Sequence, residues 1–244
     1  MRYLMILAAI PLAACGSIAM GGDSGDRAAA SGAGSTRNFA VTDFNSVELA
    51  GADDVDVSVG PAFSVRAEGP SEELDRLEIR KTGSTLSIGR KRDGNFDWGG
   101  RDRKAVKVFV TMPAIAAAAL AGSGDMRIDK VAGGDFTGAL AGSGDLSVAE
   151  ITADSAKLEI AGSGGIAAKG AVRKLSMAIA GAGDIDARGL TATGADVSIA
   201  GSGNASATVN GPASVSIMGS GDVSLGANAK CTTSKMGSGE VRCG

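Results

Sequence analysis

The chain of 244 residues contains no histidine, and aromatic residues make up only 3% of it, with a single tryptophan. Without histidine, a serine nucleophile lacks its usual imidazole base, and a zinc site lacks its usual nitrogen ligand. The 24 basic and 27 acidic residues leave a formal net charge of −3, which argues against a nucleic-acid partner. The composition thus disfavours histidine-dependent hydrolases and nucleic-acid-binding proteins.

The N-terminus lacks a hydrophobic run long enough to span a bilayer. Arg2 precedes an apolar stretch over residues 3–14, which has the length of a signal-peptide core. The stretch leads into Leu-Ala-Ala-Cys, which resembles the lipobox of bacterial lipoproteins and implies removal of residues 1–14 and acylation of Cys15. Gly16, in place of aspartate, points to the outer membrane. The alternative is an ordinary secretory signal with an incidental cysteine.

Cysteine is scarce after this point. Only Cys231 and Cys243 remain, twelve residues apart near the C-terminus. Because the bacterial envelope is oxidising, a disulfide between them is the favoured interpretation. A metal-binding pair is the alternative, but the chain has no histidine to complete a ligand set.

Glycine, by contrast, is abundant and periodic. The sequence AGSGD occurs twice, and near copies of it recur every 18–20 residues. The first glycines of these copies are Gly122, Gly142, Gly162, Gly181, Gly201, Gly219 and Gly237, and Gly51 fits the same frame. A fixed period of this size is the signature of a solenoid.

Each copy is flanked by two strand-like patterns. The residues two and four before the first glycine are mostly apolar, as are those four and six after it, and the positions between are mostly polar or alanine. A further apolar position, such as Val131 or Ile151, indicates that each coil has another inward-facing side. Stacked coils of this kind bury a continuous column. The sequence therefore predicts an all-β fold, a parallel β-helix of 18–20-residue coils over residues 119–244, right-handed by the general bias of parallel crossovers.

The glycine-rich corner itself matches no phosphate-binding loop and no hydrolase motif. An acidic residue often stands three positions after the first glycine, as in Asp125, Asp145, Asp184 and Asp222. A calcium ladder would require a charge at every rung, whereas Gly165 and Asn204 interrupt this row. Aspartate, asparagine and glycine share turn chemistry. We therefore predict a structural corner, with a metal ladder as the alternative.

The chain before the repeat has two parts. Residues 15–37 are small and polar and show no periodicity, so a flexible Gly/Ser/Ala tether is expected after the lipidated cysteine. Residues 38–118 hold a first coil at Gly51, inserted strand patterns and a short helical turn after Pro70. We expect them to form an N-terminal β cap, in the same domain as the repeat, that prevents end-to-end strand addition.

Residues 90–104, RKRDGNFDWGGRDRK, break the repeat most strongly. A glycine-rich basic loop with aromatics could grip an anionic glycan or a lipid head group. The candidate contact residues are Arg90, Arg92, Phe96, Trp98, Arg101 and Arg103. The alternative is a solvated hairpin whose aromatics pack onto the cap.

These features together resemble a known family. A strand-rich start ending in VKVFVTMP is followed by LAGSGD, LAGSGD, IAGSGG, IAGAGD, IAGSGN, IMGSGD and KMGSGE. From residue 38 to 244 the chain is similar to the "putative auto-transporter adhesin, head GIN domain" family of bacterial envelope proteins. The resemblance implies a β-helix-like fold and carries over no established catalytic residues. The last coil departs from the usual pattern, with Lys235 at an inward apolar position.

We therefore expect a non-enzymatic lipoprotein of the outer membrane that acts as an adhesin-like binding module and needs no cofactor. Its partners would be the membrane, through the lipid, and an anionic glycan, lipopolysaccharide or another envelope protein. One alternative is a purely structural envelope scaffold or spacer. The other is a polysaccharide-cleaving β-helix enzyme, but the coils from Gly122 onward have almost no spare residues for cleft-forming loops.

Overall fold

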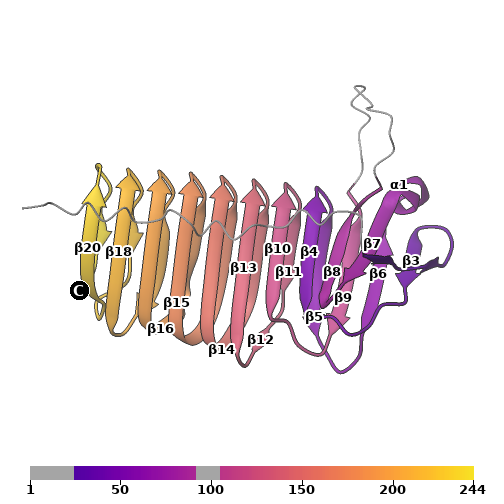
Figure 1. Ribbon diagram of the computed structural model, residues 1–244, viewed down its shortest axis with the longest axis horizontal. Helices are drawn as coiled ribbons and strands as arrows, with labels where there is room; N and C mark the ends of the chain where they lie inside the picture. The colour runs from indigo at the N-terminus through magenta and orange to yellow at the C-terminus, as the bar shows by residue number, and fades with distance from the viewer. Residues whose placement is uncertain (1–24, 92–104) are drawn as a thin grey trace, which may run out of the picture.

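The computed structural model describes residues 25–91 and 105–244. Strand makes up 68% of the structure and helix 3%. The strands wind into a β-solenoid, seen in Figure 1 as a row of similar coils that runs from a mixed cap to the last coil at β20. The predicted all-β solenoid class is thereby confirmed.

The elements divide into a cap and a stack of coils. The cap and the first coil comprise β1 (Asp26–Arg27), β2 (Ala30–Ser31), β3 (Thr36–Phe39), β4 (Ser46–Gly51), β5 (Asp54–Val59), β6 (Ser64–Glu68), α1 (Ser71–Arg76), β7 (Leu77–Thr82), β8 (Thr85–Arg90) and β9 (Lys107–Met112). The later coils comprise β10 (Ala117–Gly122), β11 (Asp125–Ile128), β12 (Val131–Ala132), β13 (Asp135–Gly142), β14 (Asp145–Gly162), β15 (Gly165–Gly181), β16 (Asp184–Gly201), β17 (Ala205–Val209), β18 (Pro212–Gly219), β19 (Val223–Ser224), β20 (Lys230–Met236) and β21 (Val241–Arg242).

Parallel pairing keeps like residues of successive coils side by side. Leu120 of β10 lies between Leu49 of β4 and Leu140 of β13. Coils of different length keep this alignment because irregularities in the pairing absorb the extra residues, as between Val148 and Ile151 in β14. Similar shifts follow in β15 and β16. All three lie well after the corner, so the glycine corners stay stacked.

The cap covers the first edge of the stack. β8 and β9 pair in parallel with β4 and β5 of the first coil. On their other edges they pair antiparallel with β7 and β6. β1 then pairs with β7, and β3 with β6. The described part of the predicted tether, residues 25–37, is therefore docked on the cap as short strands, and only residues before 25 remain for a tether.

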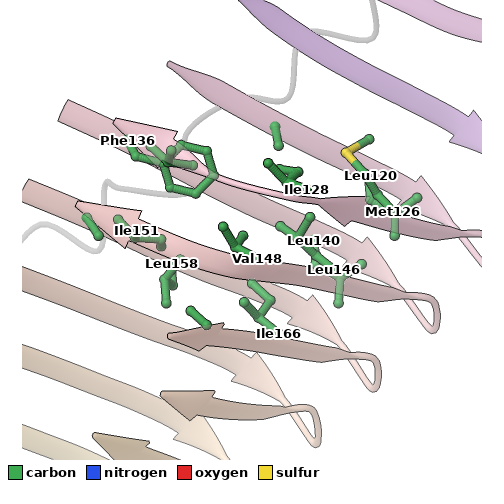
Figure 2. Close-up of a cluster of buried hydrophobic side chains, with 14 of the residues drawn as sticks. Leu120, Met126, Ile128, Phe136, Leu140, Leu146, Val148, Ile151, Leu158 and Ile166 are labelled. Carbon is green, nitrogen blue, oxygen red and sulfur yellow. The ribbon is translucent and has the colours of Figure 1, made fainter. Parts of the chain in front are cut away.

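The core is a narrow column of aliphatic side chains, and one coil admits a phenylalanine. Phe136 is 1% exposed and lies in the interior near Ile151 and Leu158 (Figure 2). Its neighbour in the next coil is the small Ala156. Two residues along the same strand, Gly138 occupies an inward position, where a β-carbon would come within 3.4 Å of the Phe136 ring. The Phe136 ring thus fits because the neighbouring inward positions hold alanine and glycine.

Candidate functional site

The corner of each coil is built around its first glycine. Gly142 has φ of 134°, a conformation that other residues rarely adopt. Its carbonyl oxygen accepts N–H bonds from Ser163 at 2.9 Å and Gly164 at 3.1 Å in the next coil. The same arrangement repeats from coil to coil, so the corner continues the hydrogen-bonded ladder between the flanking strands.

The second glycine is required by the stacking distance. A β-carbon at Gly144 would overlap the carbonyl oxygen of Gly124 in the preceding coil. The serine between the two glycines is exposed, as Ser143 is, and alanine replaces it at Ala52 and Ala182. The GSG pattern therefore has a structural explanation that does not involve the serine hydroxyl.

The corner aspartates form a ladder of their own. Oδ1 of Asp145 accepts the backbone N–H of Gly165 at 3.0 Å, and Oδ1 of Asp184 accepts that of Asn204 at 2.9 Å. The amide oxygen of Asn204 in turn accepts the N–H of Asp222 at 3.0 Å. An amide oxygen and a carboxylate oxygen thus accept the same backbone hydrogen bond from the next coil, which accounts for asparagine in this row.

The metal-ladder alternative calls for carboxylates grouped around a shared ion position. Within residues 25–91 and 105–244, no group of three or more cysteine, aspartate or glutamate side chains is arranged to hold a metal ion. The carboxylate oxygens are directed at backbone N–H groups of the next coil, as at Asp125, where Oδ1 accepts the N–H of Asp145 at 3.3 Å. These contacts are those of a structural corner.

An open groove of about 400 Å³ runs beside the ladder on the outer face of β11, β14, β15 and β16. Its lining includes Asp125, Arg127, Asp145, Gly165, Asp184 and Asp186. Hydrogen bonds and charge from Arg188 lower the pKa of the Asp186 carboxyl to about 2. The groove is therefore an open acidic surface that crosses several coils.

A different arrangement occurs at the described residues on either side of the segment 92–104. In the first coil Asp53 takes the place of the second glycine. β8 and β9 stack beneath the first coil, but the chain between them carries no Gly-Ser-Gly corner. The Asp53 side chain lies between Arg90 and Val106, where it is 1% exposed. Its carboxylate accepts hydrogen bonds from Arg90 Nε at 2.7 Å, from Arg90 Nη2, and from the backbone N–H of Val106 at 2.8 Å. Asp53 thus bonds to the described residues on both sides of the segment 92–104, which we call the insertion.

Arg90 completes this cluster. Its Nη1 also donates to a carboxylate oxygen of Glu73 on α1 at 2.6 Å. Burial of the guanidinium opposes its charge, but the hydrogen bonds and charges of Asp53 and Glu73 outweigh this and raise the pKa of Arg90. We name Asp53, Glu73 and Arg90 the base clamp.

The structure places the predicted contact residues only in part. Arg90 lies in the base clamp, with its guanidinium bonded to two carboxylates. The other candidates, Arg92, Phe96, Trp98, Arg101 and Arg103, lie outside the described residues, as does Cys15. Sequence reasoning missed Asp53. The available signal was the first coil's GADD, which departs from GSGD at a position where stacking otherwise demands glycine.

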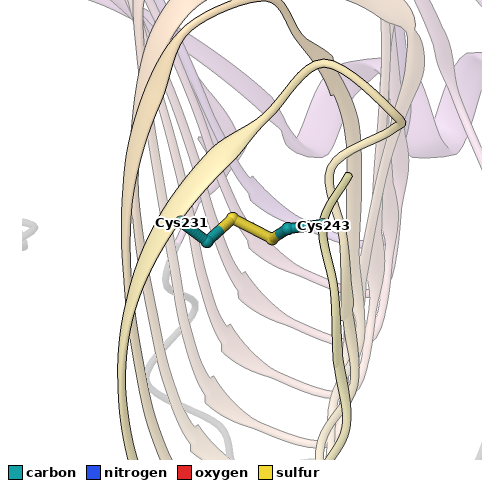
Figure 3. Close-up of a disulfide and its surroundings, with 2 residues drawn as sticks. All are labelled: Cys231 and Cys243. Carbon is teal, nitrogen blue, oxygen red and sulfur yellow. A yellow bond between two sulfur atoms is a disulfide. The ribbon is translucent and has the colours of Figure 1, made fainter.

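The two C-terminal cysteines form a disulfide in this structure. Their Cα atoms are 6.2 Å apart, and the bond crosses the interior of the last coil between its opposite walls (Figure 3). In the same stretches of chain, 25–91 and 105–244, no helix has the length and apolar character needed to cross a membrane.

Fold and corner together define a capped parallel β-solenoid protein. The chain belongs to the family described as "Putative auto-transporter adhesin, head GIN domain", whose model matches residues 43–229. The resemblance found in the sequence is thereby confirmed. No curated protein is similar to the chain at a significant level.

Solved structures share this fold. A "putative adhesin" from Bacteroides fragilis NCTC 9343 has a TM-score of 0.75 at 18% identity, over 85% of this chain and 95% of that one. A "Putative lipid binding protein" from Parabacteroides distasonis ATCC 8503 has a TM-score of 0.67 at 24% identity, with the same coverage. A "putative adhesin" from Parabacteroides merdae ATCC 43184 has a TM-score of 0.63 at 17% identity, over 86% and 95%. At these identities the likeness concerns the fold.

Proposed function

We propose that this protein is a non-enzymatic lipoprotein of the cell envelope, anchored through Cys15 in the outer membrane, and that it acts as an adhesin-like binding module. The family and several solved structures of the same fold carry the name adhesin, which supports this proposal. In the later coils the corners are tight and strands follow one another closely, so the surface is a set of straight, rigid faces. Such faces suit contact with an extended partner better than enclosure of a small substrate.

The base clamp is the observation that supports a contact through the segment 92–104. A carboxylate that is 1% exposed holds the residues on both sides of the segment 92–104. Burying and pairing charged groups in this way fixes the two ends of a segment whose sequence is rich in basic and aromatic residues. An anionic glycan, lipopolysaccharide or an acidic face of another envelope protein is the matching partner chemistry.

Binding of purified protein to a glycan and lipopolysaccharide array tests this proposal. Trp98→Ala and the pair Arg101→Ala with Arg103→Ala should abolish binding while leaving the circular dichroism spectrum unchanged. The matched control is Arg173→Ala with Lys174→Ala, which removes two exposed basic residues from β15, far from the insertion. Equal binding by the wild type and the Trp98 variant would overturn the assignment.

A structural envelope spacer is the second candidate function. The regular stacking of the corner strands from β10 to β20 favours it, because a rigid column needs no ligand to hold two layers apart. Cells in which the insertion is deleted separate the two functions. A spacer keeps its effect on envelope integrity without residues 92–104, whereas a binding module loses its activity.

A further inference from the structure

The last coil leaves a strand edge without a partner. Among the described residues, β20 pairs only with β18, and β21 only with β19. In the interior of the stack, strands such as β13 have a partner on both edges. β20 is seven residues long, and the backbone N–H and C=O groups of every second residue are therefore directed at the free edge of the column (Figure 1). An exposed edge of this kind is a template for adding another strand.

The two ends of the solenoid are protected differently. At the first end, antiparallel strands β6 and β7 cover the parallel strands β9 and β8. In the described part of the chain, no strand does this for β20. A head-to-tail stack of copies is therefore blocked by the cap, and the partner left for the β20 edge is the same edge of a second copy.

A two-fold pairing of β20 with its copy fits the strand in most respects. If Thr233 lies opposite its own copy, antiparallel pairing sets Thr232 against Ser234 and Lys230 against Met236. The inward and outward faces of the two strands then coincide. Thr–Ser pairs and a lysine stem beside a methionine are acceptable neighbours across strands.

One inward residue does not fit. Lys235 follows Ile217 in the row that otherwise carries leucine or isoleucine in every coil. Its Nζ donates to the carbonyl oxygen of Gly239 at 2.8 Å within the same coil. Lys235 is exposed in the single chain, and its charge also acts on the Glu240 carboxylate of the same coil. A second copy would take this ammonium group out of water without supplying a carboxylate opposite it, and burying an incompletely compensated charge is strongly unfavourable.

The disulfide reinforces this end. Cys231 and Cys243 continue the inward rows of Ala213 and Leu225, and the bond between them closes the last coil across its interior (Figure 3). We propose that Lys235, held in a coil closed by the Cys231–Cys243 disulfide, is a stop that keeps a second copy of this chain from docking on β20. The stop does not depend on the proposed binding function.

The test is the oligomeric state of Lys235→Ile, which restores the isoleucine row. The full chain carries Cys15→Ala in all samples, so that lipid does not mediate association. Analytical ultracentrifugation from micromolar to millimolar concentration should find the parent chain monomeric and the Lys235→Ile variant at least tenfold more dimerised. Hydrogen exchange should then show protection gained at residues 230–236 in the dimer.

Two further variants make the outcome decisive. Lys230→Ile places the same apolar residue on the outward face of the same strand and should leave the chain monomeric. Lys235→Met removes the charge while keeping an unbranched stem, and it should dimerise even where the isoleucine variant folds poorly. A folded Lys235→Met variant that stays monomeric, a Lys230→Ile variant that dimerises equally, or a parent chain that already pairs through β20 would each overturn the proposal.

Discussion

At the residue scale, stacking decides which positions of the corner are variable. Gly144→Ala places a methyl group on the carbonyl oxygen of Gly124, and that oxygen belongs to the backbone of the neighbouring coil. The strand ladder leaves no room for the clash to relax, so we expect a loss of unfolding free energy of at least about 4 kcal/mol. Ser143→Ala, one residue away, should change it by no more than about 0.5 kcal/mol. Urea denaturation of the two variants measures both values, and equal midpoints would contradict the stacking explanation.

The buried carboxylate of Asp53 is the second residue whose role can be measured. Asp53→Ala leaves Arg90 with one carboxylate instead of two and leaves the N–H of Val106 without its acceptor. Breaking a buried ion pair from one side costs about 3 kcal/mol or more. Asp54→Ala, in the adjacent corner position that lies partly exposed, should cost much less. If chemical denaturation finds the two variants equally stable, the base clamp does not stabilise the fold as proposed.

The lowered pKa of Asp186 predicts the direction in which the stability of the fold changes with pH. Its folded pKa is lowered from 3.8 to about 2, so the group stabilises the fold above its unfolded pKa, and this contribution is lost as the pH falls from 3.8 toward 2. The carboxylate and Arg188 are both largely exposed, and solvent therefore keeps the effect small. Asp186→Asn should flatten the decline of the urea midpoint in this window. A steeper decline in the variant would show that the sign is wrong.

At the scale of elements, β13 shows how the narrow column accepts a large side chain. Gly138→Ala brings a methyl group within 3.1 Å of Leu146 and 3.4 Å of the Phe136 ring, and we expect a loss of about 1–3 kcal/mol. Phe136→Leu alone leaves a void, whereas the two changes together should compensate in part. A double-mutant cycle on unfolding free energies measures this coupling. Additive losses would show that glycine at this position does not serve the phenylalanine.

The elements also show what the sequence could and could not predict. The coils were predictable because Leu120, Leu140 and their equivalents recur at a fixed period and pair with one another. The docking of β1 on β7 was not, since Asp26 and Arg27 belong to a stretch without periodicity and their pairing is set by tertiary contact. At the candidate site, Asp53 could have been found from its place in the repeat, because a side chain fits there only where no glycine corner is stacked beneath the coil.

At the scale of the whole molecule, the cap and the last coil make the two ends of the column unlike. The chain enters the structure at Gly25 beside β7, which is part of the cap, and the column extends from there to β20 (Figure 1). With a lipid on Cys15, the nine residues 16–24 could span at most about 30 Å, so the cap end would stay close to the membrane and the last coil could extend away from it.

An adhesin must face outward, and this is the central claim of the proposed function. The most direct measurement is labelling of intact cells with a membrane-impermeant lysine reagent, followed by recovery of the protein. We expect label on the exposed lysines of the solenoid, such as Lys169 and Lys174, in intact cells, and release of the protein from membranes by Cys15→Ala. Labelling that occurs only after the outer membrane is made permeable would contradict the claim.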